Sequence, residues 1–500
     1  MDEYTPLEEN SRYTLTKFSG STGDALICPV GKILLFVDGR YHEQADLEVN
    51  HEKITVVKLK SGQSQLDVIC SKIRKNSVLK INPQKNSQAR LEFLKHKLKE
   101  KNVSIDFWNE DNFSKCASRS DRKFVKISSD NFDKKIKKIK QNTLITNPEE
   151  ISYLCDIRSF DKDYTAKVEG KFLVLNGEYT LFTDYKPTEK YSFKFSIKPE
   201  EDFYRTISVV KERLCIDKNS ITAYDYLMLK HSVHKASVIK KMKSVKTRDE
   251  IEHFKYAFSC TDKALRETKN YIMNNDNLSE YDIEKYLRQA FFKYDAKSLS
   301  FKSIVAINEN SAQAHYSKSS KDKILKDGDL VLIDCGAYYC DGLATDITRV
   351  FVKGKPSELH REIYTYVLKA FLNCYNYKIK SETTGFEIDN LARKVFKKCE
   401  TKDFTFSHGL GHGLGISVHE APPNLSKNQI AKVKLKNNMC FTIEPGLYDP
   451  KYFGVRLENS CFMNRGKIKS FTNMCFEKAL INYDLLSEKE KSWLKKFEVL

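Results

Sequence analysis

The chain has 500 residues, of which 40% are hydrophobic and 12% aromatic, a composition that suits roughly two to four domains with packed cores. No apolar run is long enough for a transmembrane helix, and the acidic start MDEYTPLEENSRY lacks the basic and apolar regions of a signal peptide. The 13 cysteines, an odd number without CxxC spacing, predict reduced thiols rather than a secreted disulfide framework. We therefore expect a cytoplasmic protein without a membrane partner.

The net charge of +18 makes a nucleic-acid partner worth considering. The basic runs at Leu94–Lys101 and Lys134–Lys140, however, place apolar residues at helical intervals. This spacing predicts amphipathic helices with solvated lysine faces. No zinc-finger spacing or RNA-recognition motif accompanies the runs, so we expect no nucleic-acid partner.

A first α/β domain is predicted over residues 1–125. The strand-like segments Ala25–Cys28 and Ile33–Asp38 flank a turn signal at Pro29–Lys32. A helical pattern follows at residues 63–75.

A second α/β domain is predicted over residues 126–240. Its hairpin joins Phe172–Leu175 to Glu178–Phe182 through an Asn-Gly pair at 176–177, the strongest short turn signal. A helix is predicted near Thr222–His234.

The third domain, predicted over residues 241–500, is of the α+β class. A capping box at Thr247–Glu250 precedes a long helix over 251–272, Ser279 opens another, and residues 357–400 indicate two more. Five strand patterns lie between these helices: SIVAI, LVLIDCGAYY, TDITRVF, CFTIEPGLY and GVRLENS. The combination predicts helices covering a curved antiparallel sheet.

Four carboxylates occur on these predicted strands. Asp334 follows the apolar run Leu330–Ile333, Asp346 lies on the next strand, and Glu444 and Glu458 lie on the last two. A carboxylate in a buried strand is costly unless it is paired or bound to a metal. For any one of these acids alone, an edge strand or a buried salt bridge is the alternative interpretation.

Arg349 and Arg456 cannot neutralise all four acids, whereas two divalent cations can. The glycine-rich stretch FSHGLGHGLGISVHE adds His408, His412 and His419, and one imidazole would complete the ligand set. Ligands rich in carboxylates and free of thiols suit Mn²⁺, Co²⁺ or Zn²⁺. Two such ions would share a water, make hydroxide available near neutral pH and polarise a carbonyl.

The order D…D…H…E…E, within DCGAYYCDGLATDITRVF, HGLGHGLGISVHE, TIEPGLY and GVRLENS, resembles the pita-bread metallopeptidases. These motifs span Ser303–Ser460. KFSGSTGDALIC with LFVDGRYHEQA resembles the first domain of aminopeptidase P, Thr146–Ser159 the start of its second domain, and KALINYDLLSEKEKSWLKKF its C-terminal segment. The resemblance implies a pita-bread catalytic domain preceded by two creatinase-like α/β domains.

The resemblance also implies the metal ligands. Asp334 would bind one metal, Asp346 and Glu458 would bridge both, and His412 and Glu444 would bind the other. Glu444 would in addition shuttle a proton from the attacking water to the leaving nitrogen.

The substrate-side residues are implied in the same way. His315 and His419 would hydrogen-bond the substrate carbonyl or the developing tetrahedral intermediate. His408, Tyr448 and Arg456 would lie near the substrate. The alternatives are ordinary loop positions for His408 and His419, packing for Tyr448, and a salt bridge to a ligand carboxylate for Arg456.

One departure from the family concerns the spacing of the two aspartates. Asp334 and Asp346 are twelve positions apart, whereas the family usually has eleven. A one-residue shift in a strand turns a side chain to the opposite face. We expect the hairpin tip around Cys340–Gly342 to absorb the extra residue as a longer turn or a bulge.

The implied activity is that of an Xaa-Pro aminopeptidase, which removes the first residue from peptides with proline second. A prolidase, which cuts only Xaa-Pro dipeptides, is the alternative enzyme. A non-catalytic peptide- or protein-binding module on the same fold is the alternative of another class. Methionine aminopeptidase fits less well, because it does not need two domains before its catalytic domain. Creatinase fits less well, because it works without a metal centre. The family leads us to expect manganese and a homodimer.

Overall fold

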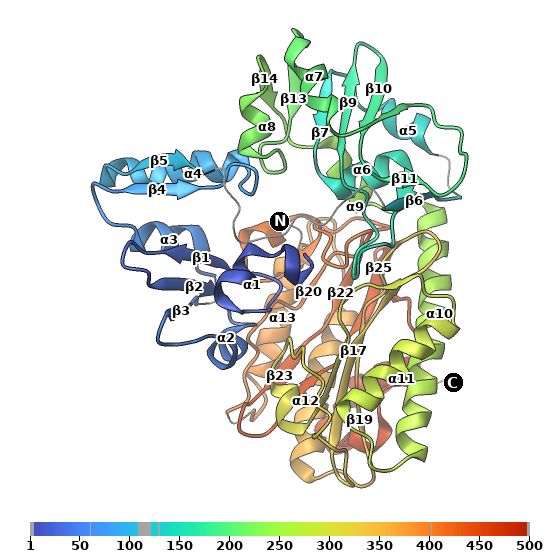
Figure 1. Cartoon of the computed structure of the whole chain (residues 1–500). Coiled ribbons are helices and arrows are strands. Elements are labelled where there is room, and N and C mark those ends of the chain that lie inside the picture. The colour runs from blue at the N-terminus through green and yellow to red at the C-terminus, as the bar shows by residue number, and fades with distance from the viewer. Residues whose placement is uncertain (1–4, 61, 109–121, 129–130, 402, 498–500) are drawn as a thin grey trace. The chain divides into compact units, whose positions relative to one another are not determined.

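The computed structural model describes residues 5–60, 62–108, 122–128, 131–401 and 403–497 (Figure 1). The chain forms two compact units, unit 1 with Met1–Lys162 and Lys167–Lys241, and unit 2 with Asp163–Ala166 and Met242–Leu500. The predicted division of the N-terminal part near residue 125 stays a prediction. Among the described residues, no helix combines the length and the apolar character needed to span a bilayer.

The first part of unit 1 contains a three-stranded sheet and a parallel strand pair. Its elements are α1 (Ser11–Thr16), β1 (Asp24–Ile27), β2 (Ile33–Val37), α2 (His42–Glu48), β3 (Ile54–Lys58), α3 (Gln65–Lys72), β4 (Val78–Ile81), α4 (Gln88–Leu98) and β5 (Ser104–Phe107). β2 pairs antiparallel with β1 and parallel with β3. The predicted β1–β2 hairpin is confirmed, because the backbone N–H of Gly31 donates to the carbonyl of Cys28 and closes the turn.

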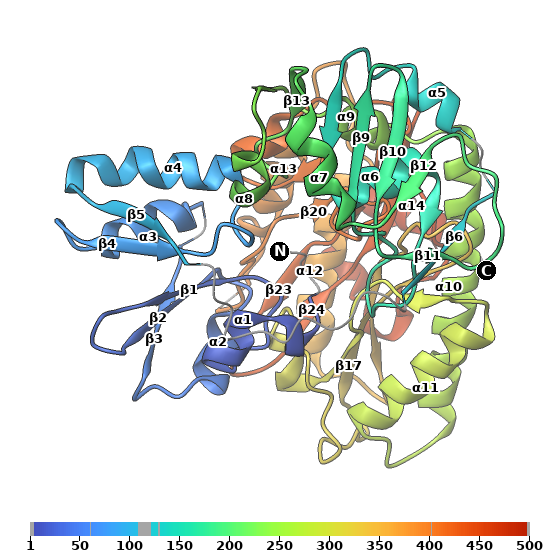
Figure 2. The same ribbon diagram turned by 45° about the horizontal axis from the view of Figure 1, so that its top comes forward.

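The rest of unit 1 is built on a six-stranded sheet of order β12-β10-β9-β7-β13-β14 and a small sheet of order β11-β6-β8. The elements are β6 (Lys123–Lys126), α5 (Phe132–Ile136), β7 (Thr143–Ile145), α6 (Pro148–Cys155), β8 (Ile157–Arg158), β9 (Lys171–Leu175), β10 (Glu178–Phe182), β11 (Lys186–Pro187), β12 (Ser196–Lys198), α7 (Asp202–Val209), β13 (Leu214–Ile216), α8 (Ala223–Leu227) and β14 (Ser232–His234). Figure 2 shows α7 across one face of the larger sheet, where its Phe203 packs edge-on against Phe182.

The Asn-Gly hairpin is confirmed, since Asn176 and Gly177 both have positive φ and join antiparallel β9 and β10. Two helix predictions were too long. The segment 222–234 is helical only in α8, because its last residues complete the sheet edge as β14, parallel to β13. The basic run after Phe132 is helical only to Ile136.

Two helices of unit 2 begin where the sequence predicts. Thr247 and Ser279 each form a capping box, and the four long helices are confirmed. The helices are α9 (Val238–Ser244), α10 (Arg248–Asn274), α11 (Glu280–Lys293), α12 (Glu358–Tyr375), α13 (Gly385–Phe396) and α14 (Glu488–Leu494).

The predicted strands of unit 2 form antiparallel pairs in several small sheets. They are β15 (Ser298–Leu299), β16 (Ile304–Ile307), β17 (Leu330–Cys335), β18 (Ala337–Tyr338), β19 (Ile347–Val352), β20 (Gly411–His412), β21 (Asn424–Leu425), β22 (Cys440–Ile443), β23 (Gly446–Tyr448), β24 (Gly454–Arg456), β25 (Asn459–Asn464) and β26 (Lys467–Ser470). Together with the helices they give the mixed helix and strand architecture that was predicted (Figure 1).

The central strand β17 is covered on both faces. Leu330 and Leu332 belong to one core with α12 and α13, whereas Val331 and Ile333 belong to another with α10 and α11. Burial of both faces explains why four consecutive positions are apolar. It also means that Asp334, at the end of the run, lies on the α12 side of the strand by alternation.

Arg349 on β19 is fully buried and joins distant segments of unit 2. Its Nη1 donates to the carbonyl of Glu458 and its Nη2 to the carbonyl of Met474, each at 2.6 Å. The guanidinium also lies 4.7 Å from the centre of the Phe476 ring. The segment that follows β26 is thereby tied to the strands that carry the acids.

Candidate metal centre

Three of the five predicted metal ligands form a tight group. Asp346, His412 and Glu458 each offer a ligand atom within 4.8 Å of the others. Glu444 joins them, because His412 Nε2 lies 3.4 Å from Asp346 Oδ2 and 3.4 Å from Glu444 Oε1. Four side chains thus converge on one point: His412 on β20, Glu444 directly after β22, Glu458 between β24 and β25, and Asp346 directly before β19.

Asp334 completes the group. Besides burial, its negative charge contributes to raising the pKa of the neighbouring Asp346. Its Oδ2 accepts a hydrogen bond from Arg456 Nη2 at 2.6 Å. Its Oδ1 is buried without a hydrogen-bond partner among the described residues, so one oxygen remains available for another ligand.

The hairpin that joins the two aspartates keeps a regular strand register. In the β17–β19 ladder Asp334 pairs with Thr348, and the same register continues to a bridge between Tyr338 and Ala344. Asp346 stands two positions before Thr348, so alternation places it on the same face as Asp334. The register is unbroken up to this bridge, and the turn beyond it comprises residues 339–343. Absorption of an extra residue by this turn stays a prediction.

The glycines around His412 allow the backbone to approach neighbouring segments closely. A Cβ atom at Gly411 would overlap the carbonyl oxygen of Thr442, and one at Gly413 would overlap that of Glu420. In the structure they let the His412 strand lie directly against β22.

Three acids of the centre have raised pKa values in the absence of a cation. Burial, together with the neighbouring carboxylates, raises the pKa of Asp346 and of Glu458 well above the ordinary value, and that of Glu444 less strongly. Glu458 Oε1, like Asp334 Oδ1, is buried without a hydrogen-bond partner among the described residues. Four carboxylates and one imidazole, with unsatisfied oxygens, fit a pair of divalent cations.

Two threonines that the sequence analysis missed support the centre. Thr348 Oγ1 donates to Glu458 Oε2 at 2.7 Å and accepts from Arg456 Nε at 3.1 Å. Thr442 Oγ1 donates to Glu444 Oε1 and accepts from the backbone N–H of His412. Each threonine lies two residues from a predicted ligand on the same strand face, and that spacing could have revealed both.

The predicted substrate-side residues form a second network. Arg456 Nη1 donates to Tyr448 OH, and His408 Nε2 lies 2.8 Å from the same oxygen. Burial raises the pKa of Tyr448 to about 12, although Arg456 opposes this shift. The alternative interpretation of Arg456 as a salt-bridge partner of Asp334 is present in the structure, and contact of these residues with a substrate stays a prediction.

His419 lies next to the predicted metal ligand His412. The two rings meet edge to face with centroids 4.3 Å apart. His315 lies half-buried in the turn after a short 3₁₀ helix (Asn308–Ala312). The next residue, Tyr316, donates to the fully buried Glu280, which also accepts from the backbone N–H of Ile307. The substrate contacts of His315 and His419 stay predictions.

Glu420 is a buried charge that the sequence analysis missed. Its Oε1 lies 2.6 Å from Lys246 Nζ, its Oε2 lies 3.4 Å from Lys243 Nζ, and Oε2 accepts from the backbone of Ile416. Burial alone would raise its pKa, but the two lysines lower it to about 2. No local pattern links Glu420 to lysines more than 170 positions earlier in the chain.

Comparisons with known proteins agree with this geometry. Residues 252–465 match Metallopeptidase family M24, and residues 120–250 match the Creatinase/Prolidase N-terminal domain. The chain is 26% identical over 551 residues to Xaa-Pro aminopeptidase 1 of Dictyostelium discoideum, covering 98% of this chain and 86% of that protein. It is 30% identical over 321 residues to an Xaa-Pro dipeptidase of Pyrococcus furiosus, covering 62% of this chain and 88% of that protein.

The fold is shared with a solved structure over nearly the whole length. An X-prolyl aminopeptidase of Caenorhabditis elegans, described as a cytosolic enzyme with a di-nuclear active site, superposes with a TM-score of 0.88 at 21% identity. The superposition covers 99% of this chain and 88% of that one. The predicted architecture, a pita-bread domain preceded by creatinase-like domains, is therefore confirmed.

Proposed function

Because the chain belongs to metallopeptidase family M24, we propose that it acts as an Xaa-Pro aminopeptidase and removes the first residue from peptides with proline in the second position. The family membership rests on the 30% identity to a relative of which this chain covers 88%. The predicted family and the predicted class, a metallo-hydrolase, are both confirmed. The substrate, the ligand roles and the order of chemical steps belong to the proposal.

The extent of the matches is the observation that favours an aminopeptidase over a dipeptidase. The match to the Dictyostelium aminopeptidase covers 98% of this chain, whereas the match to the Pyrococcus dipeptidase covers 62%. The aminopeptidase match thus extends over residues that the dipeptidase alignment leaves unmatched.

We assign the metal ligands as the family resemblance implies. Asp334 would bind one ion, His412 and Glu444 the other, and Asp346 and Glu458 would bridge them. Oxygen-rich, thiol-free ligands suit Mn²⁺, with Co²⁺ and Zn²⁺ as alternatives. When bound, two such ions acidify a shared water and polarise the scissile carbonyl.

The protein side chains would then position the substrate and move its proton. Glu444 accepts a proton from the attacking water and delivers it to the leaving nitrogen of proline. His419 and His315 donate hydrogen bonds to the carbonyl oxygen as negative charge develops on it. The nitrogen of an Xaa-Pro amide carries no hydrogen. A site that offers no hydrogen-bond acceptor at this position would therefore favour proline over other residues, whose N–H would be left unpaired.

The test compares three peptides on metal-reconstituted protein: an Xaa-Pro-Xaa tripeptide, the Xaa-Pro dipeptide, and a tripeptide with alanine in place of proline. We expect rapid release of the first residue only from the first peptide. Cleavage of the dipeptide alone would identify a prolidase. No hydrolysis of any peptide at any metal loading would favour a non-catalytic binding module.

Glu444→Gln separates the proposed proton transfer from metal binding. The amide is nearly isosteric but cannot accept the proton, so we expect kcat to fall by roughly 10²- to 10⁴-fold. Metal content, measured by elemental analysis, reports whether the centre is still loaded. An active Glu444→Gln enzyme would remove Glu444 from the proposed role.

We also propose a cytoplasmic homodimer without nucleic-acid or membrane partners. The description of the Caenorhabditis protein as cytosolic is in keeping with the location. Analytical ultracentrifugation tests the dimer. A DNA-binding titration at two salt concentrations tests whether the net charge of +18 has a nucleic-acid target.

A further inference from the structure

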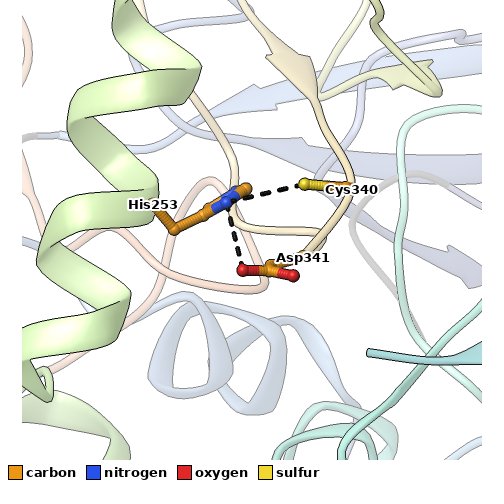
Figure 3. A group of neighbouring side chains, drawn as sticks. All are labelled: His253, Cys340 and Asp341. Carbon is orange, nitrogen blue, oxygen red and sulfur yellow. Dashed lines mark hydrogen bonds and ion pairs between the residues drawn. The ribbon is translucent and has the colours of Figure 1, made fainter. Parts of the chain in front are cut away.

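A second cluster of metal-ligating side chains lies in unit 2 and shares no residue with the candidate metal centre. It contains His253 from α10 and the consecutive residues Cys340 and Asp341 from the turn between β18 and β19 (Figure 3). One ligand atom of each lies within 4.8 Å of the others. We propose that these three residues form a site for a divalent cation of the zinc type.

The spacing of the ligand atoms is close to what a tetrahedral ion requires. With Zn–N and Zn–O bonds of about 2.1 Å and a Zn–S bond of about 2.3 Å, the ligand atoms stand roughly 3.4 Å (N to O) and 3.6 Å (N to S) apart. In the structure, His253 Nδ1 lies 3.2 Å from Asp341 Oδ2 and 3.9 Å from Cys340 Sγ. Shifts of a few tenths of an ångström would therefore accommodate the ion.

The surroundings combine a rigid ligand with an open side. His253 is 7% exposed and projects from the 27-residue helix α10. Cys340 is the exposed member among the described cysteines, and the Asp341 side chain is 26% exposed. A cation can thus enter from solvent, and water can take the fourth position.

The charges of the cluster also match a divalent ion. A thiolate and a carboxylate supply two negative charges, and the imidazole supplies a neutral nitrogen. His253 Nδ1 contacts both Asp341 Oδ2 and Cys340 Sγ. An ion pair between His253 and Asp341 alone would explain the first contact, but it would not explain why the thiol faces the same nitrogen (Figure 3).

The ligand types distinguish this site from the candidate metal centre. A thiolate and an imidazole favour zinc and cobalt, whereas the carboxylate-rich centre suits manganese. The site also uses the turn of the hairpin that joins Asp334 to Asp346. Its metal would tie this turn to α10, without changing the strand register that aligns Asp334 and Asp346.

Cobalt titration followed by absorbance tests the proposal, because a thiolate-to-cobalt charge-transfer band arises only where sulfur binds the ion. The protein is stripped with a chelator, kept reduced, and titrated with Co²⁺. We expect the band in the wild type and in Asp346→Asn, which removes a proposed ligand of the other centre. We expect no band in Cys340→Ser, whereas the matched control Cys28→Ser should retain it.

Alkylation of Cys340 gives a second measure that does not depend on cobalt. Zn²⁺ should slow its reaction with iodoacetamide by at least about tenfold, read by mass spectrometry of the labelled peptide, because the bound thiolate is shielded. His253→Gln and the more exposed Asp341→Asn should each weaken this protection, and circular dichroism reports whether they fold. A wild type without the cobalt band, a band that survives Cys340→Ser, or labelling that zinc does not slow would overturn the proposal.

Discussion

Arg456 Nη2 lies 2.6 Å from Asp334 Oδ2, and both side chains are buried. The same guanidinium reaches Tyr448 and Thr348, so one cation holds three parts of the centre in place. Its contact occupies one oxygen of Asp334 and leaves the other unpartnered among the described residues. Asp334 thus has a protein cation on one side and room for a metal on the other.

Arg456→Gln should destabilise the metal-free protein more than the metal-loaded protein. Without the guanidinium, Asp334 would be a buried charge without its partner, which costs about 3–5 kcal/mol. A bound cation would replace part of that attraction. Urea unfolding with and without Mn²⁺ measures the difference, and Arg361→Gln, at a partly exposed helical ion pair with Glu358, is the control at about 1 kcal/mol or less. An equal loss in the free energy of unfolding with and without Mn²⁺ would contradict the assignment of Asp334 as a metal ligand.

Asp346→Asn should abolish both metal retention and peptide hydrolysis. The change removes one negative charge and one bridging oxygen from a group that places its ligand atoms within 4.8 Å. Elemental analysis after gel filtration measures the metal, and Xaa-Pro-Xaa cleavage measures the activity. Asp327→Asn, at a position preceding β17, is the control that should retain both. Full activity of Asp346→Asn would exclude this aspartate from its proposed role.

Thr348→Val should weaken metal binding by roughly 10- to 100-fold, as expected when a hydrogen bond to a ligand is lost. The valine keeps the shape of the threonine but cannot donate to Glu458 or accept from Arg456. Thr348→Ser retains the hydroxyl and should restore most of the affinity. Competition with a fluorescent chelator measures the dissociation constants. Equal affinities for the valine and serine variants would leave the hydroxyl without a role.

Glu420→Gln should lower the free energy of unfolding by about 3–5 kcal/mol, because it leaves Lys243 and Lys246 buried without their counter-charge. Urea denaturation at pH 7 measures the loss. Glu382→Gln is the control, since its ion pair with Lys434 is exposed and contributes at most about 1 kcal/mol. An unchanged free energy of unfolding for Glu420→Gln would show that the ion pairs of Glu420 with Lys243 and Lys246 do not stabilise the protein.

The contribution of Glu420 should also depend on pH. Its pKa in the folded protein is about 2, below the ordinary 4.5. A lowered folded pKa gives stability that is present above the unfolded value and is lost as pH falls through the folded value. The stability difference between wild type and Glu420→Gln should therefore shrink by on the order of 3 kcal/mol between pH 5 and pH 2. A difference that stays constant over this range would contradict the pairing.

Much of the candidate site could be predicted because strand alternation is visible in sequence. The apolar run before Asp334 indicated a buried strand, and the two cores that share β17 confirm it. The capping boxes at Thr247 and Ser279 located two helix starts for an equally local reason. The same alternation would have placed Thr348 beside the acids.

Other features depended on contacts that sequence patterns do not record. The helix predicted over 222–234 was too long. Its last residues form β14, and the pairing of β14 with β13 is a tertiary contact that the local sequence does not reveal. Glu420 had no visible partner, because its lysines precede a helix in another part of the sequence. His253 meets Cys340 and Asp341 only when α10 and the β18–β19 turn are brought together.

The buried guanidinium of Arg349 has a consequence for how the protein is made. During synthesis, the strands with Asp334 and Asp346 leave the ribosome well before Met474 and Phe476, whose contacts Arg349 requires. Until those residues emerge, the Arg349 guanidinium lacks most of the hydrogen-bond acceptors that it has in the buried interior. Unit 2 must therefore complete its folding late and as a whole. Nascent or proteolytic fragments that stop before Met474 should accordingly be substrates for chaperones and degradation rather than partly active enzymes.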